Sequence, residues 1–350
     1  MDAGALRPLL EGHWYDAIAA VLTAEAAKGP EHPRLARARD IATAAKRVLD
    51  LDAEDFGQIA DSFPRQEWKA ELLDACFPAE PRGRDRGALR SLVPLYELML
   101  EVLDIRAQRH EPLQVVVTAH LIGEYLPQLA WESTLGHAGD PLYLGEMVGE
   151  RWGSDDPACP HSSALRATAR RALFACSGDA AGYQAYLDRF HSRQGAALAI
   201  CAMNHDVTEP GQRPDVGETC PNPCGWALRG SRESRRELDA RVRLAGIYGN
   251  SPIVALRHHA PVGHFFGVPS TSEISHAWVA TWTRLATDWP DGGNPLRAGG
   301  VRGAPDPTEA LPGMSALVSA VAGRTIGPGR LIRDMGATIA AEGAGPEPPE

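Results

Sequence analysis

The stretch Gln114-Val-Val-Val-Thr-Ala-His120-Leu-Ile-Gly-Glu124-Tyr-Leu-Pro-Gln-Leu129 sets two polar groups in otherwise apolar sequence. Apolar residues recur in it at spacings of three and four, which predicts a helix over residues 112–132. His120 and Glu124 are four residues apart and therefore share one face of that helix. The same periodicity recurs along the chain, so we expect an all-α fold with further helices over residues 33–50, 87–109, 163–177, 180–203 and 231–248.

The composition is that of a globular protein with a real hydrophobic core. The chain has 350 residues, of which 44% are apolar and 23% charged, and its net charge is −10. Nucleic-acid binding is not expected, because phosphate contacts need clustered Lys and Arg. No apolar run approaches the roughly 20 residues that span a bilayer, and Met1-Asp-Ala-Gly-Ala-Leu lacks the features of a secretory signal. We therefore expect a cytoplasmic protein without a membrane segment, whose 6 scattered cysteines are mostly reduced.

A second polar segment, Arg257-His258-His259-Ala-Pro-Val262-Gly-His264-Phe-Phe266-Gly267, lies far from the first in sequence. Ser251-Pro252 reads as an N-cap followed by proline at the first helical position, which predicts a helix from Pro252 to about Phe266. Three histidines beside an arginine are poorly explained by packing alone. A single His–Glu pair such as His120 and Glu124, by contrast, is ordinary at the boundary of a core.

The remaining sequence predicts how the chain is organised. Ser270-Thr-Ser-Glu273 has the spacing of a capping box and should open a helix whose core face carries Ile274, Trp278, Trp282 and Leu285. Residues 206–230 are rich in Pro, Gly and Asp, which indicates a lid or binding loop. We expect residues 1–290 to form the main helical domain, with residues 1 to about 85 as an extension packed on it. We expect residues 291–350 to form a Gly/Pro-rich segment with short helices and a disordered tail.

The two histidine segments resemble motifs of the tryptophan 2,3-dioxygenase superfamily, which includes haem-dependent tyrosine hydroxylases of natural-product (secondary) metabolism. That family has a helix written His-Gln-x-x-Glu-Leu-Trp and, further on, Arg-His-x-x-x-Val-Glu-Arg-x-Ile-Gly. Arg257, His258, Val262, Phe266 and Gly267 are in register with the second motif. His120 and Glu124 are similar to the first. The resemblance covers about a tenth of the chain, and the order of the two segments agrees with it.

The resemblance implies a helical bundle around a haem b pocket and an enzyme that oxidises a small aromatic compound with O2 or H2O2. By it His258 is the axial ligand of the haem iron, Arg257 helps to hold the haem, and His120 is the distal residue that handles a proton, with Glu124 either orienting His120 or holding its helix in place. Arg189, Arg193 and Arg257 are candidate anchors for a substrate carboxylate. A homo-oligomer is compatible with this reading.

Departures from the family pattern favour hydroxylation of an aromatic amino acid or a related compound over cleavage of an indole ring. Leu121 stands where the family has Gln. Val268-Pro-Ser-Thr-Ser-Glu273 follows Gly267, where ring-cleaving members have a Gly-Thr-Gly-Gly-type loop. Ring cleavage remains the alternative within this class.

Other residues leave two alternatives of different classes open. The first is a metal-dependent all-α hydrolase that uses His205-Asp206. A zinc site from Cys159-Pro-His161 with Cys220 and Cys224 is a related possibility, although the cysteine spacing is one residue longer than usual. Ser154-Asp155-Asp156 is weak evidence for a magnesium site, because such a pair is usually a turn. The second alternative is a helical binding protein without chemistry.

Overall fold

The computed structural model describes residues 3–28, 32–144, 163–176, 179–195, 231–259, 267–290, 292–297 and 306–343. Every regular element in these ranges is helical, and no strand occurs among them. The prediction of an all-α fold is therefore confirmed. None of the described helices has the length and the apolar character needed to cross a bilayer.

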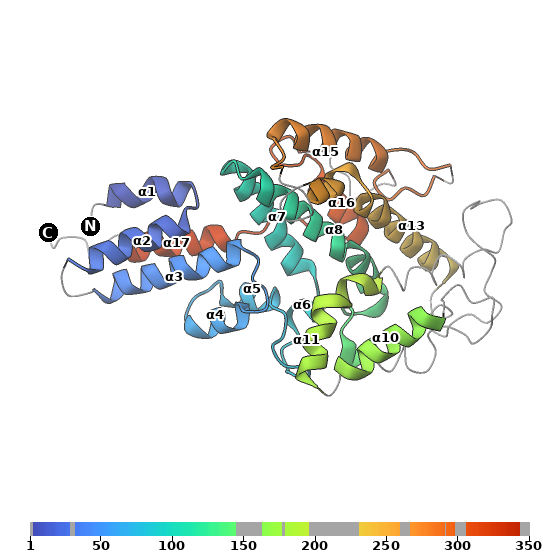
Figure 1. Cartoon of the computed structure of the whole chain (residues 1–350), viewed down its shortest axis with the longest axis horizontal. Coiled ribbons are helices and arrows are strands. Elements are labelled where there is room, and N and C mark those ends of the chain that lie inside the picture. The colour runs from blue at the N-terminus through green and yellow to red at the C-terminus, as the bar shows by residue number, and fades with distance from the viewer. Residues whose placement is uncertain are drawn as a thin grey trace.

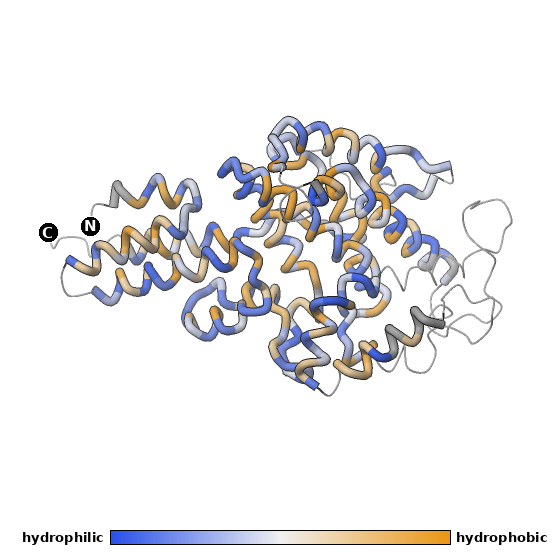
Figure 2. Tube along the Cα trace, viewed as in Figure 1, coloured by the Kyte–Doolittle hydropathy of each residue, from blue (hydrophilic) through white to orange (hydrophobic). Residues whose placement is uncertain are grey.

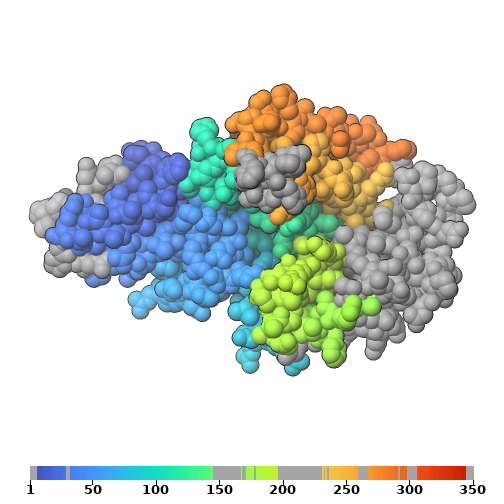
Figure 3. Space-filling model, viewed as in Figure 1, coloured from blue at the N-terminus to red at the C-terminus, as the bar shows by residue number. Residues whose placement is uncertain are grey.

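The N-terminal helices form a bundle that the C-terminal helix completes. It consists of α1 (Ala3–Glu11), α2 (Tyr15–Ala26), α3 (Pro33–Leu49) and α17 (Leu331–Gly343), and α17 packs against both α3 and α1. Figure 1 shows the red α17 lying among the blue helices, and Figure 3 shows that this end of the molecule projects from the main body. One face of α3 is buried and largely of small side chains, which let neighbouring helices approach closely: Ala38, Ile41, Ala42, Ala45 and Val48.

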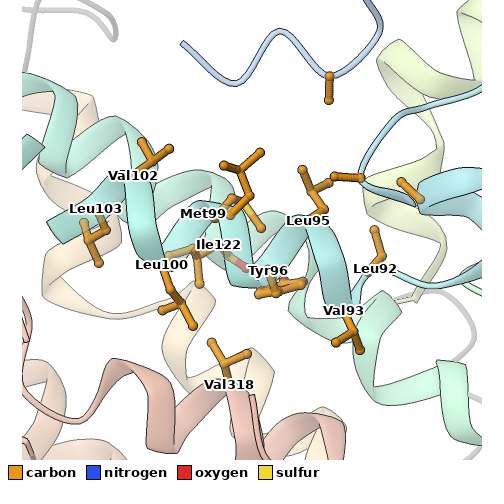
Figure 4. Packing of buried hydrophobic residues seen from close by; sticks show 14 of the residues in the cluster. Leu92, Val93, Leu95, Tyr96, Met99, Leu100, Val102, Leu103, Ile122 and Val318 are labelled. Atoms are coloured by element: carbon orange, nitrogen blue, oxygen red, sulfur yellow. Dashed lines mark hydrogen bonds between the residues drawn. The ribbon is translucent and has the colours of Figure 1, made fainter. Parts of the chain in front are cut away.

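Two long helices form the centre of the main body. These are α7 (Val93–Gln108) and α8 (Pro112–Leu135), and α13 (Arg232–Gly249) and α16 (Met314–Ala322) pack against α8. Figure 4 shows buried side chains of α7 meeting Ile122 of α8 and Val318 of α16, and the Tyr96 hydroxyl donates a hydrogen bond to the Ile122 carbonyl oxygen at 2.8 Å. Apolar residues concentrate along these central helices (Figure 2). Full burial of each such Leu, Ile or Val contributes about 1.5–3 kcal/mol.

The helix expected over residues 87–109 is two helices, α6 (Gly87–Arg90) and α7. Ser91 between them is extended, with φ −154 and ψ 131 degrees. The cause lies on α8, where the Glu132 carboxylate accepts the Ser91 hydroxyl at 2.6 Å and the Leu92 backbone N–H at 2.9 Å. Pro94 at the beginning of α7 lacks the backbone N–H that a continuous helix would need. A contact from another helix thus ends α6 and begins α7.

The region after Ser251 also departs from expectation. The helix predicted to run to about Phe266 consists of one turn, α14 (Pro252–Ala255), followed by the 3-10 turn η1 (Leu256–His259); residues 260–266 lie outside the described residues. By contrast, α15 (Thr271–Leu285) begins with the predicted Ser270–Glu273 capping box. Its predicted core face is confirmed, since Ile274, Trp278 and Leu285 are buried and Trp282 packs against them.

The other described helices are short and flank the centre: α4 (Phe56–Ser62), α5 (Lys69–Asp74), α10 (Ser163–Cys176), α11 (Ala180–Arg189) and the helical residues 191–195. The expected loop over residues 206–230 lies outside the described residues. Cys76 and Cys176 are buried free thiols. Burial raises the pKa of each thiol to about 11, so both are thiols rather than thiolates at neutral pH.

Candidate functional site

The two histidine segments meet at a cluster formed by His120 and Glu124 of α8 and Arg257 of η1. His120 Nε2 lies 2.9 Å from Glu124 Oε1, as the spacing of four predicts. Arg257 Nη1 contacts the same His120 Nε2, and it lies 3.8 Å from Glu124 Oε1. The His120 side chain is 12% exposed, whereas those of Glu124 and Arg257 are 40% and 37% exposed. The cluster therefore opens to solvent on its charged side.

The contacts of His120 Nε2 make opposite demands on one nitrogen. A carboxylate only accepts hydrogen bonds, so the contact with Glu124 requires a proton on Nε2. A guanidinium only donates, so the contact with Arg257 requires a lone pair on Nε2. The other nitrogen, Nδ1, is buried and has no hydrogen-bond partner. Glu124 thus favours the tautomer of His120 with the hydrogen on Nε2, and Arg257 the tautomer with the hydrogen on Nδ1.

The charges around Glu124 leave the cluster with a net positive charge. The pKa of Glu124 is lowered, first by the hydrogen bond from His120 and further by the charges of His120, Arg257 and Arg193, so this carboxyl is ionised at neutral pH. Two guanidinium groups against one carboxylate give a net charge of about +1 with His120 neutral. In a chain whose net charge is −10, this local excess favours an anionic ligand.

Arg193 lies in the helical residues 191–195, and its charge helps to lower the pKa of Glu124. Aromatic rings pack around His191 of the same segment. The centroid of the His191 ring lies 5.7 Å from that of Tyr125 and 5.6 Å from that of Phe77, and the Phe77 and Tyr125 centroids are 6.2 Å apart. Of the three arginines expected as anchors for a substrate carboxylate, Arg193 and Arg257 carry charges that lower the pKa of Glu124. Arg189 ends α11 and is exposed.

The predicted haem site needs His120 and His258 to face one iron from opposite sides. Successive residues of a 3-10 helix are about 120° apart around its axis. Because Arg257 is directed at His120, His258 leaves η1 in a different direction, and its side chain is exposed. Arg257 also occupies the His120 nitrogen that would have to face a bound haem. In the described arrangement these residues do not fit a haem between them, and the ligand role of His258 stays a prediction.

The alternative metal sites lie outside the described residues. These are Cys159, His161, Cys220 and Cys224, the His205-Asp206 pair, and Asp155 with Asp156. His264 and the side chain of His259 also lie outside them. Within the described part of the chain, no group of three or more His, Cys, Asp or Glu side chains is placed to hold a metal ion.

Sequence reasoning missed two residues next to the cluster, Gln128 and His191. Gln128 lies one turn beyond Glu124 on α8, so the spacing of four from His120 to Glu124, continued once more, is the signal that would have found it. His191 has no comparable signal, because its position depends on how residues 191–195 pack against α8.

Comparison with known proteins does not place the chain in a family. No family model matches it, and neither the curated proteins nor the solved structures contain a significant match.

Proposed function

We propose that the protein is an enzyme that binds a small organic acid at the His120–Glu124–Arg257 cluster and uses His120 to transfer a proton. The observation that carries this proposal is the position of His120 Nε2 between a carboxylate and a guanidinium. The excess of positive charge supports an anionic ligand, and the neighbouring rings of Tyr125 and Phe77 are compatible with an aromatic one.

The same contacts supply a sequence of events. An acid that pairs with Arg257 draws the guanidinium away from His120 Nε2. The freed nitrogen then accepts a proton from the ligand, and the resulting imidazolium is stabilised by Glu124. In this scheme Arg193 provides a second cation for the ligand, while Glu124 orients the ring. Binding of the ligand to Arg257 therefore also frees His120 Nε2 to act as the base.

Benzoate titrations test the proposal. We expect benzoate to bind and to shift the ¹⁵N resonance of His120 Nε2. Because a charge-assisted hydrogen bond contributes about 1.5–3 kcal/mol, Arg257→Gln should weaken binding by roughly 10- to 100-fold. The control Arg330→Gln changes an exposed arginine on the N-terminal side of α17 and should bind benzoate as the wild type does. An unchanged His120 resonance, or equal affinity in the Arg257→Gln variant, contradicts the proposal.

A second candidate is the haem-dependent oxidation of a small aromatic compound with O2 or H2O2. It is favoured by the contact of Arg257 with His120, because this contact brings together the two segments that carry the resemblance, 137 residues apart. A bound haem would supply the oxidising chemistry, and Arg257 would have to leave His120 for it.

Haem titration of the purified protein separates the two candidates. The haem proposal expects a Soret band that is lost in His258→Ala and retained in His259→Ala. A wild-type protein that binds no haem, or equal loss in both variants, refutes it.

A further inference from the structure

The turn between α1 and α2 is one place where the N-terminal bundle contacts the end of α7. The guanidinium of Arg109, the residue that follows α7, donates to the His13 carbonyl oxygen at 3.0 Å and lies 4.0 Å from the centroid of the Trp14 ring. Glu111 pairs with the same guanidinium at 2.7 Å, and the Arg109 side chain is 5% exposed. A buried cation of the main body therefore holds this turn in place.

His13 lies in this turn with a φ of 54 degrees, in the left-handed region where His, Asn and Asp are enriched among residues that carry a side chain. Its ring is half-buried, and its Nδ1 lies 3.2 Å from the Tyr15 hydroxyl oxygen. That hydroxyl donates its own hydrogen to the Ile332 carbonyl oxygen of α17 at 2.8 Å, so its oxygen accepts from His13 Nδ1. The His13 ring thus links the turn to α2 and α17, and its hydrogen is on Nδ1.

Two cations lie near the His13 ring, one from each element that the turn contacts. Burial lowers the pKa of His13, and the charges of Arg333 of α17 and Arg109 of α7 lower it further, to about 4. The ring is therefore neutral at neutral pH. A proton gained by His13 would add a third positive charge to this half-buried junction.

The nearby carboxylates are engaged by other donors. Glu101 of α7 accepts two backbone N–H groups of α17, and Asp104 accepts one from the segment before α16. The neighbouring titratable groups of α1, α2 and α17 are the exposed pairs Arg7–Glu11 and Arg330–Asp334, the exposed Asp16, and the buried phenol of Tyr15, whose pKa burial raises.

We propose that His13 makes this junction acid-sensitive, so that the α1–α2 turn separates from α7 and α17 when His13 takes up a proton. The new proton goes to Nε2, because Nδ1 already carries one. Separation relieves the repulsion from Arg109 and Arg333 and returns the charged ring to water. This inference concerns a different part of the molecule from the His120 cluster and does not depend on the function proposed for that cluster.

The direction of the pH dependence follows from the pKa of His13 in the two states. It is about 4 in the closed junction and near its ordinary 6.5 once the turn has separated. The contribution of His13 to the closed junction is therefore present above pH 6.5 and is lost as the pH falls toward 4. From pH 7 to 4.5 this shifts the equilibrium toward the open junction by roughly 50-fold. Glu101 and Asp104 act in the opposite sense, because burial raises their pKa values, so a substitution has to isolate the part due to His13.

Hydrogen exchange of the full chain at pH 7 and 4.5, corrected for intrinsic exchange rates, measures this opening. His13→Asn keeps a residue that tolerates the left-handed conformation but takes up no proton. We expect the amides of residues 14–18 to lose roughly 50-fold more protection in the wild type than in His13→Asn. The matched control is His110→Asn, which changes an exposed histidine with a φ of 56 degrees after α7 and should lose protection as the wild type does.

Arg333→Gln tests the role of charge separately from packing. It removes one of the two cations, so the pKa of His13, followed by NMR titration of its ring, should rise toward 6.5 and the loss of protection at pH 4.5 should shrink. Equal loss of protection in the wild type and His13→Asn overturns the inference. An equal loss in residues 14–18 and in α8 also overturns it, since acid then unfolds the whole chain, as does a His13 ring that titrates near 6.5 in the folded wild type.

Discussion

Breaking the buried ion pair between Arg86 and Asp140 should destabilise the protein more than any exposed ion pair does. Arg86 Nε and Nη2 donate to the two Asp140 oxygens at 2.7 and 2.9 Å, and the two side chains are 8% and 0% exposed. Arg86 Nη1 also donates to the carbonyl oxygens of Pro81 and Gly83 at 3.0 and 3.1 Å. The pair therefore ties the 81–86 turn to the segment that contacts Gln128 and His191.

The magnitude follows from what each substitution leaves behind. Asp140→Ala leaves a buried guanidinium without its carboxylate, and Arg86→Leu leaves a buried carboxylate, so each should cost about 3–5 kcal/mol. The double variant leaves no uncompensated charge. It should be about as unstable as either single variant, which gives a coupling energy of about 3–5 kcal/mol in a double-mutant cycle.

Urea unfolding monitored by circular dichroism measures these free energies. The matched control is Asp288→Ala, which breaks a 2.9 Å pair with Arg297 whose side chains are 75% and 56% exposed, and it should cost less than about 1 kcal/mol. The argument that burial makes this pair essential would be refuted if either single variant lost less than about 1 kcal/mol of the free energy of unfolding. It would also be refuted if the loss in the double variant were the sum of the two single losses.

Three further predictions concern the contacts of the core. Glu101→Ala removes the buried carboxylate that accepts the backbone N–H groups of Ile332 and Arg333 at 3.2 and 3.0 Å, so it should cost about 2–3 kcal/mol and accelerate hydrogen exchange in α17; unchanged exchange there contradicts it. Gly139→Ala should be strongly destabilising in thermal unfolding, because φ is +73 degrees and the added Cβ meets Gln128; a Tm within a degree of wild type counts against the packing. In the folded protein the pKa of His191 is lowered to about 4, whereas in the unfolded chain it is near 6.5. Between pH 6.5 and 4 the unfolded state takes up this proton and the folded state does not, so the free energy of unfolding should fall by roughly 3 kcal/mol over that range. His191→Phe should lack this part of the pH dependence in urea titrations.

Local sequence signals predicted the helices whose boundaries are set locally. The Ser270–Glu273 capping box begins α15 as expected, and α3 begins at Pro33, where the predicted helix over residues 33–50 begins. Pro94 is a local signal for a break in the helix expected over 87–109, but the position of the break at Ser91 depends on the carboxylate of Glu132, a residue of another helix. Local patterns record helix propensity, whereas the end of α6 is decided by a tertiary hydrogen bond.

The same distinction between local and tertiary causes applies to the candidate site. The contact between His120 and Glu124 was predictable because both lie on one helix at a spacing of four. The approach of Arg257 depends on the packing of η1 against α8, and no pattern in either segment fixes it. The helix predicted from Pro252 is confirmed only in part for a related reason. The chain changes to a 3-10 turn at Leu256, which alters the directions of Arg257 and His258 from those in a continuous α-helix.

The polar residues of α8 lead from a partly open surface into the buried core. His120, Glu124 and Gln128 follow one another at intervals of four, and each adds about 40° of rotation around the axis of an ideal helix. The stripe therefore turns gradually as it advances. At His120 and Glu124 it faces η1 and remains partly open to solvent, whereas at Gln128 it has turned beneath residues 138–139 and 191–195 and is fully buried. Charged groups are tolerated at the open end, where water and arginines solvate them, and only a neutral amide is tolerated at the closed end. The change from carboxylate to amide along the stripe is thus the change that burial requires.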